Sequence, residues 1–169
     1  METGKANNIQ AKTFNSFNCK QYHLSVEIGL QSIAYCIINN QTNDLQYFNK
    51  LIIDNDFVNI INEEEVLKLN FASSSVAFTN FPCTLVPNEV FQAENAKDIL
   101  QLNSDIYEVI KSDKLANSNT HLCYTVPSVI SDIVFTFFPN ASQKAQQTIL
   151  IDKFSCNKNT DDNVYLYLN

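Results

Sequence analysis

Three strand-like runs follow one another closely near the beginning of the chain, and they constrain the fold more than any other feature. Residues 22–28 read YHLSVEI, with an apolar residue at every second position, which is the period of a half-buried β-strand. Similar runs follow at 32–38 and 45–53. They are separated by a short turn at Gly29 and by residues 39–44, whose Asn and Asp side chains favour turns. Connections this short join antiparallel neighbours, so the sequence predicts a three-strand meander.

The remainder of the chain alternates between helical and strand-like patterns. Helices are predicted at 57–69 with Asp56 as N-cap, at a short segment that Asn88 caps and that carries Val90 and Phe91, and at 96–110, 129–138 and 141–154. Strands are predicted at 74–79, at 83–86 as an extension of the same sheet after Pro82, and at 121–126. Strands that follow a helical crossover lie parallel to a neighbour.

The predicted fold class is therefore α/β, with an α+β mixed sheet in which a three-strand meander is followed by alternating helices and strands. The ribonuclease-H-like half of the actin-like ATPases has this order of elements. In that architecture a complete molecule consists of two such halves with nucleotide between them.

The predicted domain organisation has three parts. Residues 1–20 are polar and aperiodic and are expected to form a flexible N-terminus. Residues 21–156 are expected to form the ribonuclease-H-like domain. Residues 157–169 are expected to be a linker and the first strand of an incomplete second half, because residues 164–168 (VYLYL) alternate like an opening strand. We therefore expect the chain to be a fragment or a split protein.

The composition excludes most of the known phosphate-binding motifs. The chain has 169 residues, with glycine only at Gly4 and Gly29 and with eleven lysines but no arginine. Walker-type phosphate loops and dinucleotide-binding fingerprints need two or three closely spaced glycines, so both motifs are absent. A bidentate guanidinium clamp and an arginine finger are excluded as well.

The charge and the hydropathy pattern exclude two further classes of partner. A net charge of −7 and scattered lysines oppose binding to nucleic acid and to anionic membrane surfaces. No window approaches the roughly 18 apolar residues of a membrane span, and the polar N-terminus has no apolar signal-peptide core. The sequence therefore predicts no nucleic-acid partner, no membrane partner and a cytoplasmic location.

The side chains that could carry chemistry form no recognisable motif. The five cysteines are widely spaced and odd in number, which suits reduced thiols in a core. His23 and His121 lie on predicted strands, where a sheet-face role is favoured over that of a catalytic base. In residues 63–65 (EEE) successive side chains would point about 100° apart around a helix, which favours solvent exposure over metal ligation. We predict no catalytic residue, no cofactor-binding residue, no metal-binding residue and no cofactor.

Three segments resemble a known family. Residues 23–37 (HLSVEIGLQSIAYCI), 84–91 (TLVPNEVF) and Phe138-Pro139 are similar to an uncharacterised family of Bacteroidetes bacteria, a domain of unknown function with an actin-like ATPase fold. The second segment resembles the most recognisable motif of that family, a strand end followed by a helix, and the third resembles a later Phe-Pro that closes a helix. The resemblance extends from Tyr22 to about Leu168, which would be the first half of the family and the entrance to its second half.

The resemblance directs attention to the turn after the first strand. Actin-like kinases and ATPases carry an Asp-x-Gly-Thr/Ser type turn there, in which Asp serves the Mg²⁺ shell while Gly and the hydroxyl serve phosphate. Gly29 matches this pattern, but Glu27 replaces the Asp and Leu30 replaces the hydroxyl residue; Ser32 could serve only if the hairpin register slipped. A tight turn in which Gly29 adopts a positive φ is favoured over a phosphate role.

These observations lead to three functional hypotheses. The leading one is a non-catalytic, degenerate actin-like-fold protein that acts through protein contacts, with a protein partner or with a second copy of itself through a sheet edge. The alternative is half of a nucleotide-binding kinase or ATPase of the actin-like superfamily that needs a second half to complete its site. The third is a truncated gene product without a function.

Overall fold

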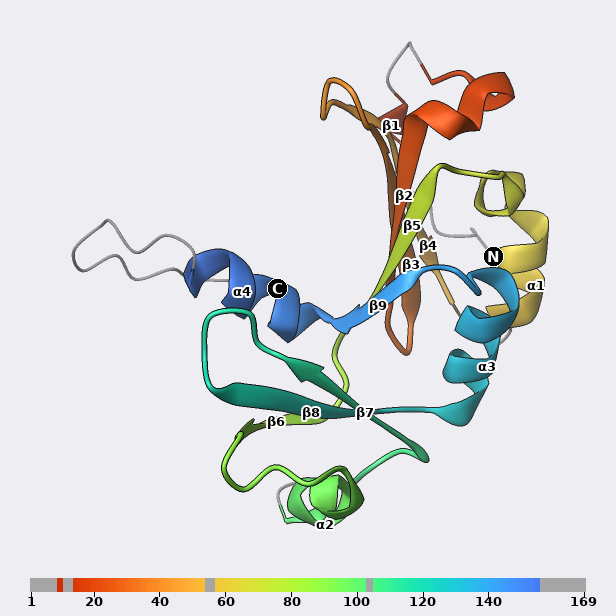
Figure 1. Ribbon diagram of the computed structural model, residues 1–169. Coiled ribbons are helices and arrows are strands. Elements are labelled where there is room, and N and C mark those ends of the chain that lie inside the picture. Colours follow the sequence, from red (N-terminus) through yellow and green to blue (C-terminus); the bar gives the residue numbers. More distant parts are fainter. Residues whose placement is uncertain (1–8, 11–13, 54–56, 103–104, 156–169) are drawn as a thin grey trace.

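The computed structural model describes residues 9–10, 14–53, 57–102 and 105–155. Within them the chain forms a six-stranded mixed sheet of order β1-β4-β3-β2-β5-β9 and a three-stranded sheet of order β6-β8-β7 (Figure 1). The strands are β1 (Ile9–Gln10), β2 (Tyr22–Ile28), β3 (Ser32–Asn39), β4 (Leu45–Ile52), β5 (Ser73–Phe78), β6 (Cys83–Pro87), β7 (Val109–Lys114), β8 (Thr120–Val126) and β9 (Ser142–Ala145). The helices are α1 (Phe57–Glu63), α2 (Ala96–Gln101), α3 (Ser128–Phe137) and α4 (Gln146–Ser155), with 3-10 helices η1 (Ser16–Gln21), η2 (Glu65–Lys68) and η3 (Ala93–Asn95).

The strands β2, β3 and β4 form the antiparallel meander that the sequence predicts. Every second residue of β2 is buried and the residues between are half-buried, so the alternation in the sequence is the alternation between the two faces of the sheet. In the turn before β4, Asn39 Oδ1 accepts from the amides of Gln41 and Thr42 at 2.8 and 3.2 Å, and Asn43 has a φ of 58°. The Asn-rich segment is therefore a turn, as predicted.

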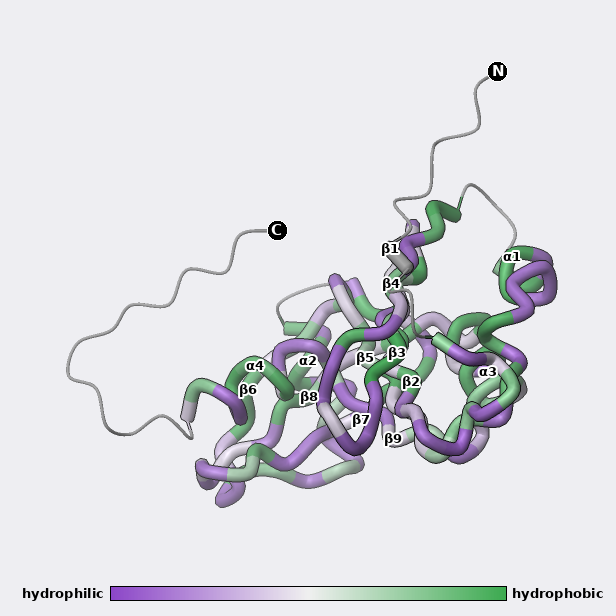
Figure 2. Tube along the Cα trace, turned by 90° about the horizontal axis from the view of Figure 1, so that it is seen from above, coloured by the Kyte–Doolittle hydropathy of each residue, from purple (hydrophilic) through white to green (hydrophobic). Residues whose placement is uncertain are grey.

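The later strands of the large sheet run parallel to their neighbours. The strand β5 pairs with β2, and β9 pairs with β5. The connections contain α1 and α3, which lie on the same side of the large sheet (Figures 1 and 2). Ile61 of α1 and Ile130 and Val134 of α3 are buried there. The predicted fold class, a mixed sheet with helices packed on it, is confirmed.

The helix predicted at residues 57–69 is divided in two. The helix α1 ends at Glu63, Glu64 is extended with a φ of −87° and a ψ of 90°, and η2 follows. Ile61 and Leu67 are both buried, but in one straight helix they would point about 120° apart. The break allows both side chains to enter the core. Asp56, the predicted N-cap, lies outside the described residues.

The strand predicted at residues 83–86 does not extend the large sheet. The chain turns away after β5 at Asn80, whose φ is 60°, and β6 pairs with β8 in the separate three-stranded sheet. The strand predicted at 121–126 corresponds to β8, which is antiparallel to both of its neighbours and not parallel as expected. A single left-handed residue redirected the chain, and a hydropathy pattern contains no signal for such a change of sheet.

Two other predicted helices are shortened or absent. Residues 88–90 form a turn in which Asn88 Nδ2 donates to Asn119 Oδ1 at 2.8 Å and does not cap a helix. Among the described residues of the segment 96–110, helix is confined to α2, and β7 begins at Val109. Pairing with the central strand β8 overrides an apolar spacing that also fits a helix.

The helix predicted at residues 141–154 begins only at Gln146, because residues 142–145 form β9 at the edge of the large sheet. The sequence SQKA has no strand-like alternation, and the backbone of β5 supplies its pairing partner. Asp113 of β7 caps the start of α4. Its Oδ2 accepts from the amide of Ala145 at 2.7 Å and from Thr148 Oγ1 at 2.8 Å.

Both sheets contribute to the main hydrophobic core. Val76 and Phe78 of β5 belong to the same buried cluster as Tyr124 of β8, and the ring centroids of Phe78 and Tyr124 are 6.0 Å apart. A smaller buried cluster around Leu100 and Cys123 lies between α2 and the three-stranded sheet. The three-stranded sheet is therefore packed on the large sheet through a common core.

The described structure begins before the predicted domain. The strand β1 pairs antiparallel with β4, η1 leads into β2, and Cys19 in η1 is buried. The linker and strand predicted at 157–169 lie outside the described residues.

Candidate functional site

The turn between β2 and β3 is the place where the sequence predicts a degenerate phosphate site. Gly29 is buried, and its amide donates to the carbonyl of Ser32 at 3.0 Å. Its φ is not positive, so the prediction of a left-handed glycine is wrong. Close packing requires the glycine instead, because a Cβ at this position would lie 3.0 Å from Thr79 Cγ2 and 3.5 Å from Thr79 O.

Three polar side chains meet beside this turn, at the carboxyl ends of β2 and β5 and the start of α4. Thr79 Oγ1 donates to Gln146 Oε1 at 2.7 Å, and Gln146 Nε2 donates to Glu27 Oε2 at 3.2 Å. Thr79 is buried, while Glu27 and Gln146 are half-buried. This is the edge at which open α/β sheets bind their ligands. The only charged group of these three side chains is the carboxylate of Glu27, which attracts cations and repels phosphate.

The hydrogen bonds of the turn favour the degenerate-site hypothesis over a phosphate role. The amide of Gly29 donates its hydrogen bond within the turn, to the carbonyl of Ser32. The carbonyl of Gln31 accepts from the amide of Ile53 at 2.8 Å. Leu30, at the position of the expected hydroxyl residue, is 45% exposed. A phosphate at this turn would therefore meet an apolar side chain and a carboxylate.

Both histidines lie on strands, as predicted. His23 on β2 bridges two serines of β5, with Nδ1 2.7 Å from Ser73 Oγ and Nε2 2.9 Å from Ser75 Oγ. Burial lowers the pKa of His23 below its ordinary value. His121 on β8 stacks on Phe91 with ring centroids 3.9 Å apart. These contacts hold strands and loops together, and the structure does not bring the two histidines to one site.

The described cysteines are free thiols, as the spacing indicates. Burial raises the pKa of each of them, which disfavours the reactive thiolate. They are Cys19, Cys36, Cys83 and Cys123. Cys156 lies outside the described residues. In the part of the chain that the structure describes, no group of three His, Cys, Asp or Glu side chains could hold a metal ion.

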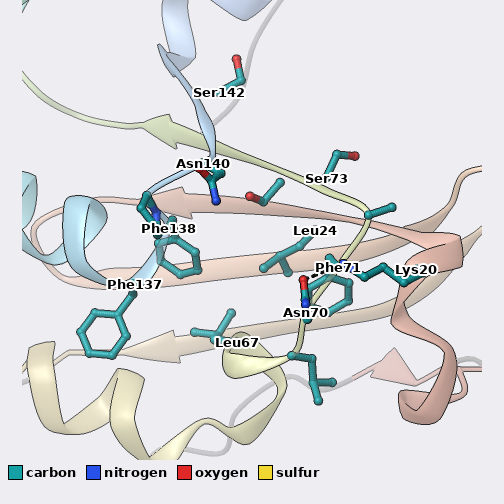
Figure 3. Close-up of a pocket in the computed structure, with 14 residues that line it drawn as sticks. Lys20, Leu24, Leu67, Asn70, Phe71, Ser73, Phe137, Phe138, Asn140 and Ser142 are labelled. Carbon is teal, nitrogen blue, oxygen red and sulfur yellow. Dashed lines mark hydrogen bonds between the residues drawn. The ribbon is translucent and has the colours of Figure 1, made fainter.

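A cavity of about 570 Å³ lies at the opposite ends of these strands, where β2, β5 and β9 begin (Figure 3). Leu24, Phe71 and Phe138 line it and are buried. Lys20 lies at the polar side of the cavity, and its Nζ donates to Asn70 Oδ1 at 2.8 Å. The cavity thus combines an apolar wall with one cationic group.

No sequence pattern predicts this cavity. Its lining comes from three separated segments, residues 20–24, 67–74 and 137–142. No motif connects them, since they come together only when β9 pairs with β5 and α3 packs on the sheet. The sequence marked Leu24 as part of a strand and Phe138-Pro139 as a helix end with a family resemblance, but neither pattern indicated a cavity.

Among the described residues, no helix is both long enough and apolar enough to cross a membrane. This agrees with the absence of a long apolar window in the sequence.

The comparisons with known proteins identify the family and the fold. Residues 11–169 match the family described as "Protein of unknown function (DUF3822)". No curated protein matches the sequence. The structure is similar to that of a Bacteroides thetaiotaomicron protein with an actin-like ATPase fold and unknown function, with a TM-score of 0.74 and 19% sequence identity. The match covers 85% of this chain but 59% of that one, so this chain spans less than two thirds of its neighbour.

The likeness to that structure confirms the predicted α/β fold of the actin-like ATPase type. The resemblance that the segments 23–37 and 84–91 indicate is confirmed by the family match over nearly the whole sequence. The chain belongs to the DUF3822 family.

Proposed function

We propose that this chain is a non-catalytic, degenerate member of the actin-like fold that acts through protein contacts. The observation that carries the proposal is the face of the large sheet opposite to α1 and α3. The side chains of β2 and β3 on this face are half-buried, whereas those on the other face are buried. We call this surface the open face.

Apolar side chains of the open face gather where β3 and β4 pair, on both sides of the exposed Lys50 of β4. These side chains are Cys36, Ile38 and Phe48, which are half-buried, and Leu45 and Ile52, which are 51% and 61% exposed. Apolar groups that gather on one surface mark contact sites more often than scattered ones do. A protein partner that covers this face would remove these groups from water, which favours binding.

The geometry beside Gly29 supports the non-catalytic part of the proposal. The amide of Gly29, which could hold phosphate, donates its hydrogen bond to the carbonyl of Ser32 instead. Glu27 is hydrogen-bonded to Gln146. A catalytic phosphate site would need preorganised donors at this position.

Crosslinking in the native cell, with a tagged chain, tests the proposed contact. Ile52→Lys places a charge on the open face, and Val90→Lys is the matched control, because Val90 is 59% exposed in the turn after β6. We expect a defined crosslinked product with the wild type and with Val90→Lys, and its loss with Ile52→Lys. The same products from all three chains, or a monodisperse monomer without any product, would contradict the proposal.

The second candidate is half of a nucleotide-binding kinase or ATPase that a further half completes. The meeting of Glu27, Thr79 and Gln146 at the carboxyl ends of the strands favours it. The predicted division into a domain at 21–156 and the beginning of a second half at 157–169 is part of both candidates. Saturating Mg·ATP would then raise the melting temperature. No shift, alone or with the separately expressed second half, would exclude this candidate.

The proposal also includes a cytoplasmic location. Free thiols among the described residues support it, because thiols stay reduced in that compartment. Fractionation of cells that produce the tagged chain tests this part.

A further inference from the structure

We propose that the cavity where β2, β5 and β9 begin binds a small monocarboxylate with an apolar body. The body would lie against Leu24, Phe71 and Phe138, and the carboxylate would pair with Lys20. The inference is independent of the proposed protein contacts, because Leu24 belongs to the buried face of the sheet and not to the open face.

The apolar wall is already formed in the protein. Leu24, Phe71 and Phe138 are 2%, 9% and 4% exposed, and they come from β2, the loop before β5 and the end of α3. Figure 3 shows the rings of Phe71 and Phe138 on either side of Leu24. At about 570 Å³ the cavity has the size of typical small-molecule sites. Leu69 and Phe137, which also line the cavity, are half-buried, and a ligand that covers their accessible surface gains the free energy of apolar burial without a large rearrangement.

The charge of the cavity selects an anion. Lys20 is the one charged residue among the described lining residues, which include no Asp or Glu. Its Nζ donates to the neutral amide oxygen of Asn70, which uses one of its three donors, and within the described ranges no carboxylate forms an ion pair with it. In a chain with a net charge of −7, such a site stands out from its surroundings.

The chemistry of the lining favours a carboxylate over a phosphate. A phosphate dianion is best held by guanidinium forks or by several cations, and this cavity offers one ammonium group. A single carboxylate matches that charge. The remaining polar lining, such as Ser74 and Asn140, can donate further hydrogen bonds to it.

Calorimetric titration of the full chain with sodium decanoate, below its micelle concentration, tests the proposal. Decanol is the uncharged probe of the same length. We expect decanoate to bind, and Lys20→Met to weaken it about tenfold, the ratio for loss of one charge-assisted hydrogen bond. Decanol should bind the wild type and Lys20→Met equally. Lys97→Met on α2 is the matched control, because Lys97 is exposed and lies outside the cavity, and it should leave decanoate binding unchanged.

A second variant locates the ligand. Asn140 is exposed and lines the cavity beside Phe138 (Figure 3), so Asn140→Trp should fill the entrance and abolish decanoate binding while the circular dichroism spectrum stays unchanged. The proposal is overturned if wild type does not bind decanoate. It is equally overturned if Lys20→Met or a folded Asn140→Trp binds decanoate as tightly as wild type does.

Discussion

At Gly29 the absence of a side chain serves packing between the β2–β3 turn and the end of β5. Gly29→Ala would place a Cβ 3.0 Å from the buried Cγ2 of Thr79. We expect the free energy of unfolding to fall by about 1–3 kcal/mol, the cost of overpacking a close contact. Urea denaturation with circular dichroism measures this change.

Thr79→Ser provides the control for this contact, since it removes Cγ2 but keeps the hydroxyl that donates to Gln146. In the Thr79→Ser background Gly29→Ala should cost clearly less, so that a double-mutant cycle yields a favourable coupling. Equal cost in both backgrounds would show that the backbone, and not this methyl group, requires the glycine.

His23 provides a second prediction at this scale, because both of its ring nitrogens are hydrogen-bonded to serines of β5. Burial holds its pKa below the ordinary value, which is about 6.5 in an unfolded chain. The unfolded chain therefore binds more protons as the pH falls, and the stability from neutral His23 is complete above about pH 6.5 and decreases below it.

His23→Gln removes this titration. We expect the stability difference between the wild type and the variant, measured in urea over a series of pH values, to decrease as the pH falls from about 7 to 5. A difference that stays constant over this range would mean that His23 titrates alike in the folded and unfolded chain.

At the scale of elements, the sequence predicted those parts whose pattern is local. The alternation in residues 22–28 and the turn residues at 39–44 specify the meander without reference to the rest of the chain. The strand β9 was missed because SQKA pairs only through the free edge of β5. The separate sheet was missed because the left-handed Asn80 redirects the chain. The missed strands form through pairing with distant segments, which a local pattern does not record.

The docking of α4 depends on a carboxylate from another element. Asp113 of β7 accepts from the amide of Ala145 and the hydroxyl of Thr148, and Thr148 is buried. Asp113→Ala leaves these donors unpaired, so we expect a loss of about 2–4 kcal/mol in the free energy of unfolding. Urea denaturation measures the loss.

Asp105→Ala is the control for this prediction, because Asp105 is exposed. It should change stability by less than about 0.5 kcal/mol, as most surface substitutions do. If Asp113→Ala were as stable as this control, α4 would be held by its packing alone.

At the scale of the whole molecule, neither candidate site could be predicted completely. The sequence singled out Gly29 and Glu27, but Thr79 and Gln146 join them only when β5 and α4 are in place. The cavity beside Lys20 depends on three segments that meet through strand pairing and helix packing. Sites built from distant segments have no characteristic residue spacing in the sequence. The fold was therefore easier to predict than the candidate binding sites.

The common core predicts that the two sheets unfold as one unit. Val126 of β8 is completely buried in the cluster that also contains Val76 of β5, and Asp113 ties β7 to the start of α4. We expect Val126→Ala, which leaves a small cavity, to cost about 2 kcal/mol. In hydrogen exchange with mass spectrometry, peptides from β5 and β8 should lose protection by the same amount, because both open through global unfolding. A loss of protection confined to β6, β7 and β8 would show that the three-stranded sheet unfolds independently. The large sheet would then be the more stable unit.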